Sequence, residues 1–380
     1  MQQRGNLERR YSAHLRPRRR ARGRILPQLR LSQRELLLAG LAVVAIVAAL
    51  ISNPGSRSTG LQSPLSLPLG GVGGSAARLA VATSTPAPSP TPTPSAIRPQ
   101  VAPTAAPVSA TAPAPVRKPD TPDPSPSTDH VIVVDGDSGA ILFQKNAYEP
   151  IAPASLTKIM TAILGIEYGT LSEHVHVDVD ARTLADSTVM GLEPWFDVTV
   201  EDLLYGLMLP SGNDAALAIA RYVSGSDAAF VQLMNQKASW LGLKATHFAN
   251  PHGLDDPDHY SSPYDMVAMA RYGMQYPTFR KLAAAKRYDI RESNISYTIL
   301  NLNPILGVYP GADGVKIGYT DNSGRSMVAT AVRNGHRVYV AFMKSEDGLA
   351  PETTNLLDWA FNSFTWPQSG GDSGSNEAGS

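Results

Sequence analysis

The pattern of hydrophobic and polar positions divides the chain into stretches of different character. Residues 36–51 form an apolar run without a charge, residues 53–128 show no apolar period, and the chain from residue 129 onward alternates between strand-like and helix-like patterns. We therefore expect five parts. These are a basic tail at 1–35, a membrane segment at 36–52, a disordered linker at 53–128, a folded domain at 129–367 and a disordered tail at 368–380.

The first half of the folded part predicts a hairpin followed by helices. Two β-rich runs around a turn of Gly, Asp and Ser predict a hairpin over 130–143, and a buried helix then begins near Ser155. After a short β-rich piece at 174–179, a polar start and apolar spacing predict a helix over 199–209, which Pro210 ends. Similar patterns predict two further helices, at 213–220 and 227–241.

The second half of the folded part ends in strands and a helix. Apolar alternation predicts strands at 314–317, 326–332 and 337–343, with Asn334-Gly335 as the turn of a hairpin between the last two. One side of a final helix is expected to carry the apolar residues Leu356, Leu357, Trp359, Ala360 and Phe364.

The apolar run at 36–51 follows a tail rich in arginine. Excess positive charge on one flank keeps that flank in the cytoplasm, so the pattern favours a single-pass anchor whose remainder lies outside the cytoplasm. The run is slightly shorter than the ~20 residues that usually span a bilayer. A cleaved signal peptide is therefore the alternative, and in that case the protein is secreted.

Proline dominates the stretch between the apolar run and the folded part. Of the 31 prolines in the chain, 14 lie between Pro86 and Pro126, among Ser, Thr and Ala. Such a composition buries no core and favours extended polyproline II, which allows a reach of roughly 200 Å. The stretch is predicted to be a spacer for a domain that works at a distance from its membrane, for example within a cell wall.

Charge and cysteine content exclude several classes of function. The 33 basic residues balance the 33 acidic ones, whereas proteins that bind nucleic acids usually carry a basic excess. The chain contains no cysteine, which excludes thiol catalysis, cysteine-ligated zinc and disulfides.

The stretch from Pro153 to Ala162 contains a candidate nucleophile beside a candidate base. Residues three apart on a helix share one face, so the hydroxyl of Ser155 and the amine of Lys158 lie within hydrogen-bonding reach. Serine attacks a carbonyl at neutral pH only if a neighbour removes its proton. A lysine performs this task when burial or a second cation lowers its pKa.

Two further motifs follow in an order that fits this chemistry. Ser211-Gly212-Asn213 lies at the break between two predicted helices, and Lys316-Ile317-Gly318 lies on a predicted strand. Together with Ser155-x-x-Lys158, with 250–254 and with 310–316, they make the chain resemble the serine D-alanyl-D-alanine carboxypeptidases, the low-molecular-mass penicillin-binding proteins, over roughly residues 129–364. The resemblance implies an α/β domain of the α+β type, similar to β-lactamases and transpeptidases, in which helices flank an antiparallel sheet.

The resemblance also implies a role for each motif. Ser155 is expected to attack the carbonyl of the penultimate D-alanine with Lys158 as base, and Ser211 to pass a proton to the leaving amine. The expected substrates are peptidoglycan stem peptides, and β-lactam antibiotics are expected to acylate the same serine. Neither a cofactor nor a metal is expected.

The remaining candidate residues are expected to bind the substrate. Asn213 holds its amide, and Lys316 supplies positive charge that keeps Lys158 deprotonated and attracts an anionic substrate. The backbone N–H groups of Ser155 and Tyr319 form the expected oxyanion hole, where Gly318 allows strand and substrate to approach closely.

One position departs from the pattern of the family. Ile317 occupies the place where the family usually has threonine, and it has no hydroxyl to bind the terminal carboxylate of the substrate. No arginine occurs at 344–348 to replace that contact. Three functions therefore stay open, namely a DD-carboxypeptidase, a DD-endopeptidase that cuts cross-links, and a weakened homologue that only binds the wall.

Two other enzyme classes compete with this interpretation. His174, His176, His252, Asp255, Asp256 and His259 are candidate metal ligands. Their spacing does not match His-Glu-x-x-His, so a metal hydrolase is not favoured. A β-lactamase needs a deacylating carboxylate, and no Glu-x-x-Leu-Asn lies between Asn213 and Lys316.

Overall fold

The computed structural model describes residues 97–110, 112–184, 187–292 and 295–367. The predicted membrane segment at 36–52 and the predicted C-terminal tail at 368–380 lie outside these residues. Among the residues that the structure describes, no helix is long and apolar enough to cross a membrane.

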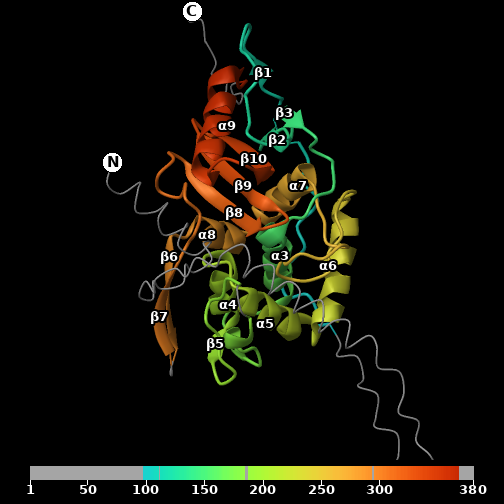
Figure 1. Ribbon diagram of the computed structural model, residues 1–380, viewed down its shortest axis with the longest axis vertical. Coiled ribbons are helices and arrows are strands. Elements are labelled where there is room, and N and C mark those ends of the chain that lie inside the picture. The colour runs from blue at the N-terminus through green and yellow to red at the C-terminus, as the bar shows by residue number, and fades with distance from the viewer. Residues whose placement is uncertain (1–96, 111, 185–186, 293–294, 368–380) are drawn as a thin grey trace, which may run out of the picture. The chain divides into compact units, whose positions relative to one another are not determined.

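A five-stranded antiparallel sheet forms the upper half of the domain in Figure 1. In spatial order its strands are β3 (Ile141–Lys145), β2 (His130–Asp135), β10 (His336–Ser345), β9 (Gly324–Arg333) and β8 (Ala312–Thr320). Because β2 pairs with β10, the sheet joins the N-terminal hairpin to the C-terminal strands. This confirms the antiparallel sheet that the sequence predicts.

Apolar side chains cover both faces of the sheet. Along β2, Val131 and Val133 belong to one buried cluster, and Ile132 and Val134 belong to another, as the period of two in a strand requires. Helix α9 (Leu349–Ser363) covers the face of Val131 and Val133, which we call the α9 face. The other helices lie on the side of the second face, which we call the helical face (Figure 1).

Six helices lie on the side of the helical face, and they include every helix expected before residue 250. They are α3 (Lys158–Tyr168), α4 (Val200–Met208), α5 (Asn213–Ser224), α6 (Asp227–Leu241), α7 (Pro263–Gly273) and α8 (Pro277–Ala284). Helix α4 begins where its polar start predicts, because the Thr199 hydroxyl accepts from the Asp202 N–H and the Asp202 carboxylate accepts from the Thr199 N–H.

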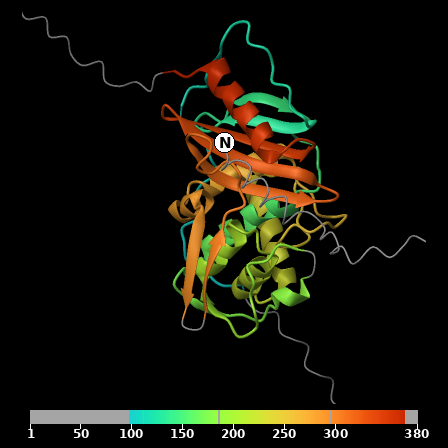
Figure 2. The same cartoon turned by 60° about the vertical axis from the view of Figure 1, so that its left-hand side comes forward.

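Three two-stranded pairs complete the fold. They are β1 (Val116–Arg117) with β11 (Phe364–Thr365), β4 (His174–His176) with β5 (Asp197–Thr199), and β6 (Arg287–Glu292) with β7 (Ile295–Leu300). The hairpin of β6 and β7, which projects beside the helices in Figure 2, was not predicted, and neither were α7 and α8. The prediction that Phe364 belongs to the final helix was wrong, because α9 ends at Ser363 and Phe364 pairs with Arg117 in a strand.

The structure differs from the expected linker in its last part. Residues 97–110 and 112–128 lie along the domain, with β1 paired to β11 and the Pro122 carbonyl accepting from Trp359 Nε1. Near the end of this stretch, Ser127 donates from its N–H and its hydroxyl to the carboxylate of Glu352. Extended polyproline chain forms no hydrogen bonds between its own backbone groups, so its N–H and C=O groups remain available for the domain surface.

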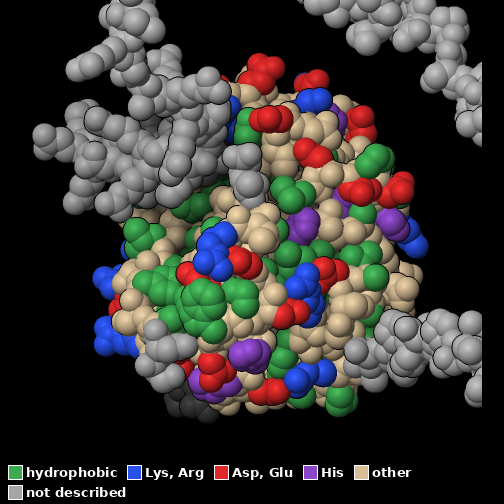
Figure 3. Space-filling model, turned by 60° about the horizontal axis from the view of Figure 1, so that its bottom comes forward, with side chains coloured by type: hydrophobic (Ala, Val, Ile, Leu, Met, Phe, Trp, Pro, Cys, Tyr) green, Lys and Arg blue, Asp and Glu red, His purple; other side chains and the backbone are tan. Residues whose placement is uncertain are grey.

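The helical end of the domain faces the viewer in Figure 3. Basic and acidic side chains are interspersed on this face, with hydrophobic side chains between them.

Candidate active site

Ser155 lies in a short 3-10 turn, Ala154–Thr157, which leads directly into α3. The expected α-helical turn is therefore a tighter one, but it still brings Ser155 Oγ to 2.9 Å from Lys158 Nζ. Ala154 has a φ of 48°, in the left-handed region that non-glycine residues rarely adopt. Gly253 packs against this turn, and a Cβ on that glycine would lie 1.9 Å from the Ala154 carbonyl oxygen.

The amine of Lys158 is fully buried and lies among three oxygen atoms. Besides Ser155 Oγ, these are Asn213 Oδ1 and the His252 carbonyl oxygen, each 2.7 Å away. Burial holds the pKa of Lys158 well below its usual value, and the positive charge of Lys316 lowers it further. A neutral amine has two N–H groups and one lone pair. Because Asn213 Oδ1 and the His252 carbonyl only accept, they take the two N–H groups, and the lone pair is left for the O–H of Ser155.

Ser211 occupies the loop between α4 and α5. Its φ of 64° is in the left-handed region, and its buried Oγ has no hydrogen-bond partner among the described residues. The loop is fixed through its backbone, because Thr188 Oγ1 donates to the Ser211 carbonyl and the Asn213 N–H donates to the Thr188 carbonyl. Backbone strain and an unpaired buried hydroxyl at one position are typical of functional sites.

Strand β8 closes the site from the side of the sheet. Gly318 lies against the Ser155 turn, since a Cβ on this glycine would be 3.1 Å from the Ser155 nitrogen. Lys316 is almost fully buried, its Nζ donates to the Ile317 carbonyl, and burial lowers its pKa to about 7. The Tyr319 side chain is occupied elsewhere, because its hydroxyl donates to Asp321, so Tyr319 offers only its backbone to the site.

Ile317 lies on the opposite face of the strand from Lys316. Its side chain is 6% exposed and belongs to the apolar cluster beneath α9, together with Met327 and Leu349. The sequence pattern suggests a side chain that points toward the substrate, whereas the structure shows one that packs in a core.

Asp214 is a residue of the site that sequence reasoning missed. Its fully buried carboxylate accepts from the N–H groups of Met190, Gly191 and Leu192, which fixes that segment beside the Ser211 loop. Its negative charge also raises the pKa of Lys158 and so opposes Lys316. The only sequence signal is its place in the first turn of α5, where acidic residues are common for general reasons.

The loop at 250–259 supports the Ser155 turn. Thr161 Oγ1 donates to the Pro251 carbonyl, and His259 Nε2 lies 2.7 Å from Thr157 Oγ1. His259 Nδ1 accepts from the Ala249 N–H, so in the neutral ring Nε2 carries the hydrogen. Burial lowers the pKa of His259 to about 4 and that of His252 to about 3. Within the described ranges, no group of three His, Asp or Glu side chains is arranged to hold a metal ion.

The structure thus brings Ser155, Lys158 and Asn213 into one hydrogen-bonded group and places Gly318 against it. Lys316 acts on this group through its charge, and Ser211 lies two residues before Asn213 with a hydroxyl that has no hydrogen-bond partner in the described part of the chain. The arrangement has the parts that acyl transfer requires, namely a nucleophile, a buried base and backbone N–H groups close by.

Comparison with known proteins agrees with this chemistry. Residues 117–347 match the D-alanyl-D-alanine carboxypeptidase family, peptidase family S11. The D-alanyl-D-alanine carboxypeptidase DacF of Bacillus subtilis is 37% identical over 243 residues, which cover 61% of this chain and 62% of that protein. The chain therefore spans slightly less than two thirds of the length of this relative.

Solved structures show the same fold. A D-alanyl-D-alanine carboxypeptidase from Mycobacterium tuberculosis superimposes with a TM-score of 0.61 at 33% identity, over 67% of this chain and 97% of that one. Penicillin binding protein 5 from Haemophilus influenzae gives a TM-score of 0.60 at 33% identity, over 64% of this chain and 73% of that one.

Proposed function

Because the chain belongs to the D-alanyl-D-alanine carboxypeptidase family, we propose that it is a penicillin-binding serine DD-carboxypeptidase that removes the terminal D-alanine from peptidoglycan stem peptides. One observation carries the proposal. The buried amine of Lys158, whose pKa is lowered, lies 2.9 Å from Ser155 Oγ with its N–H groups already taken by other acceptors.

In the acylation step, Ser155 Oγ attacks the carbonyl carbon of the penultimate D-alanine. Lys158 takes the hydroxyl proton as the new C–O bond forms. The carbonyl oxygen becomes an oxyanion, which the N–H groups of Ser155 and Tyr319 stabilise. Asn213 holds the substrate amide, while its Oδ1 continues to orient Lys158.

In the next step the C–N bond breaks and the terminal D-alanine leaves. Its nitrogen needs a proton, which Ser211 passes on from Lys158, and the unpaired Oγ of Ser211 is available for this relay. Water then attacks the ester carbonyl with Lys158 as base, and the released Ser155 regains its proton. A β-lactam follows the first step but keeps its leaving nitrogen tethered within the adduct.

We also propose a place for the domain in the cell. The charge-free run at 36–51 behind an arginine-rich tail favours a membrane anchor, with the catalytic domain on the cell-wall side and a role in wall remodelling. Sequencing the mature N-terminus tests this proposal. A mature chain that starts after Ile51 contradicts the anchor and indicates secretion.

Incubation with a fluorescent penicillin tests the function directly. We expect one covalent label per chain on the peptide that contains Ser155, together with release of D-alanine from a peptide ending in D-Ala-D-Ala. Peptidase activity that a chelator abolishes, without any labelling, would indicate a metal hydrolase and overturn the proposal.

A further inference from the structure

Two helices carry residues of the site at their first positions. Lys158 begins α3 and Asn213 begins α5, and Lys158 Nζ lies 2.7 Å from Asn213 Oδ1. The helices are 11 and 12 residues long and pack against each other. At 1.5 Å per residue they run about 16–18 Å from the site. Their C-terminal ends are therefore neighbours at the opposite end of the helical layer.

The segment at residues 98–106, which we call the clamp segment, binds the C-terminal ends of both helices. The N–H groups of Val101 and Ala102 donate to the Glu167 carbonyl in the last turn of α3. Arg98 donates from its N–H to the Val223 carbonyl and from its Nε to the Tyr222 carbonyl, both in the last turn of α5.

These contacts satisfy groups that a helix leaves unpaired. The last four carbonyls of a helix have no partner within the helix and need one from outside. Helix α3 ends at Tyr168, and the following Gly169 is extended instead of forming the left-handed cap that often closes a helix. The last turn of α3 has no basic residue. The clamp segment supplies the missing donors at α3, and the Arg98 guanidinium adds positive charge at the negative end of α5.

Arg98 attaches the clamp segment through its side chain as well as its backbone. Its guanidinium pairs through both oxygens with the carboxylate of Glu173, at 2.9 and 3.0 Å, and lies 3.9 Å above the ring of Tyr222. The Tyr222 hydroxyl donates to the same carboxylate at 2.6 Å. Arg98 thus joins the loop after α3 to the last turn of α5.

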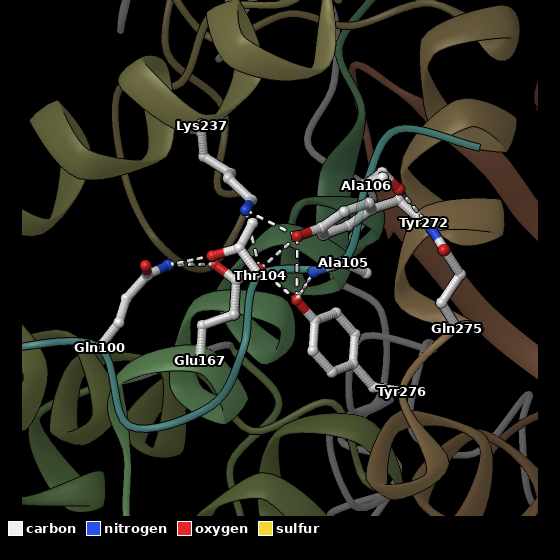
Figure 4. A network of polar contacts seen from close by, with 9 residues as sticks. All are labelled: Gln100, Thr104, Ala105, Ala106, Glu167, Lys237, Tyr272, Gln275 and Tyr276. Carbon is white, nitrogen blue, oxygen red and sulfur yellow. Dashed lines mark hydrogen bonds and ion pairs between the residues drawn. The ribbon is translucent and has the colours of Figure 1, made fainter. Parts of the chain in front are cut away.

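A buried network lies beneath the other half of the clamp segment (Figure 4). The Glu167 carboxylate is fully buried and accepts from Lys237 of α6, from the Tyr272 hydroxyl of α7 and from the Tyr276 hydroxyl just after α7. The clamp segment closes this network, because Gln100 Nε2 donates to Glu167 and the Ala105 N–H donates to the Tyr276 hydroxyl oxygen. The end of α3 is thereby fixed to its neighbours.

We infer that the clamp segment is a positioning element of the active site, because it ties together the far ends of the two helices that present Lys158 and Asn213. A rigid helix transmits the position of one end to the other, so the spacing of the C-terminal ends helps to set the contact between these two side chains. The inference rests on the proposed function and assigns a task to a stretch whose composition suggests only a spacer.

Two substitutions in the full-length chain weaken the clamp segment without touching the site. Arg98→Ala removes the ion pair and the ring contact, and Ala102→Pro removes one of the two N–H groups that cap α3. Ala106→Pro is the matched control, because Ala106 also precedes a proline and its N–H makes no hydrogen bond to any described residue. Its carbonyl, which accepts from Gln275, is unchanged by the substitution.

Two measurements are made on each variant. Hydrogen exchange at the Val101 and Ala105 amides reports whether the clamp segment is bound. Stopped-flow acylation by a β-lactam at several concentrations separates the dissociation constant of the first complex from the rate constant k2 of the chemical step. For the double variant we expect exchange to rise about tenfold and k2 to fall about three- to tenfold with the dissociation constant unchanged. The control is expected to match the unsubstituted chain.

Four results would overturn the inference. In the double variant these are faster exchange with an unchanged k2, unchanged exchange, and a fall in k2 that is explained by a smaller fraction of active protein. The fourth is an equal fall in k2 in the Ala106→Pro control. Failure of the unsubstituted chain to be acylated at Ser155 would refute the proposed function and with it the positioning role. Exchange would still show in that case whether the clamp segment binds.

Discussion

The two faces of the five-stranded sheet are packed for different purposes. On the α9 face the buried cluster is built from Val, Ile, Leu, Met, Phe, Ala and Tyr side chains between the sheet and α9. The buried carboxylates on this side, Asp135 and Glu352, accept hydrogen bonds from Trp366 and Ser127. The helical face holds a larger cluster together with buried ionisable groups, among them Lys158, Asp214, Glu167, Lys237 and Lys316. The cluster on the α9 face stabilises the fold, whereas the helical face stabilises the fold and also holds the residues of the candidate active site.

Two neighbours on β8 show the difference within a single strand. The side chain of Lys316 enters the helical face, where its charge acts on Lys158. The side chain of Ile317 enters the α9 face and packs among apolar residues. A buried charge is expensive unless a function or a partner requires it, and among the described residues Lys316 Nζ has only the Ile317 carbonyl as a hydrogen-bond partner. The helical face is therefore the face on which substitutions should affect activity.

The largest effect is expected for Ser155→Ala on the helical face. Loss of the nucleophile should abolish penicillin labelling and lower peptidase turnover by about 10⁴-fold or more. The melting temperature should hardly change, since the site loses only one oxygen atom. Ser296→Ala, at an exposed position of β7, is the control and should keep full activity. Undiminished turnover in the Ser155 variant would refute the mechanism.

Ser211→Gly should separate activity from stability. Glycine accepts the φ of 64° without strain and removes a buried hydroxyl that has no partner among the described residues. We expect the variant to be more stable by about 1 kcal/mol, while acylation slows by about 10²-fold because the proton relay is lost. Thermal unfolding and acylation rates measure the two effects, and a variant that loses stability would contradict the interpretation of strain.

The sequence allowed the centre of the site to be predicted because its geometry is local. Ser155 and Lys158 are three residues apart, and Asn213 follows a helix break that Pro210 marks. The 3-10 form of the Ser155 turn was not predictable, because Gly253 and the 250–259 loop impose it from a distance. Asp214 was missed for the same reason, since its partners at 190–192 belong to a loop without a pattern.

The fold was predictable where apolar periods are strong and obscure where they are weak. The hairpin at 130–145 and the strands β8 to β10 follow from alternation, whereas β6 carries charged residues at both ends and gives little signal. The clamp segment has no period at all. It binds mainly through backbone N–H groups and Arg98, and a residue pattern does not encode backbone contacts.

An intermediate effect is expected when the charge of Lys316 is removed. Lys158 must be neutral to act as base, so acylation should fall as pH drops through its pKa. The positive charge of Lys316 lowers that pKa, and Lys316→Met removes the charge while keeping a long side chain. The acid limb of the pH profile should therefore move to higher pH, and acylation at pH 7 should fall about 10- to 100-fold.

The basic limb of the same pH profile tests what happens when Lys316 loses its charge by deprotonation. Because its pKa is lowered to about 7, the unsubstituted protein should lose the Lys316 charge, and with it attraction for an anionic substrate, as the pH rises through about 7. This limb should be absent from the Lys316→Met variant. An acid limb that stays at the same pH after the substitution would show that the charge of Lys316 does not lower the pKa of Lys158.

The smallest effect on activity is expected for Ile317→Thr, although threonine is the residue that the family pattern favours there. The side chain is 6% exposed within the apolar cluster of the α9 face, so a new hydroxyl would be buried among apolar side chains and directed away from the face that holds Lys158. We expect kcat/KM on a peptide ending in D-Ala-D-Ala to stay within about threefold of the unsubstituted value. Stability should fall by about 2–3 kcal/mol.

Ile317→Val isolates the contribution of the hydroxyl, because valine and threonine have nearly the same shape. The valine variant should lose only about 0.5–1.5 kcal/mol, so the further loss in the threonine variant measures the cost of the buried hydroxyl. Activity is compared on the D-Ala-D-Ala peptide and on an analogue whose terminal carboxylate is amidated. A gain by the threonine variant confined to the free-carboxylate peptide would place residue 317 in contact with substrate. The functional division between the two faces of the sheet would then fail at β8, the edge strand that lines the site.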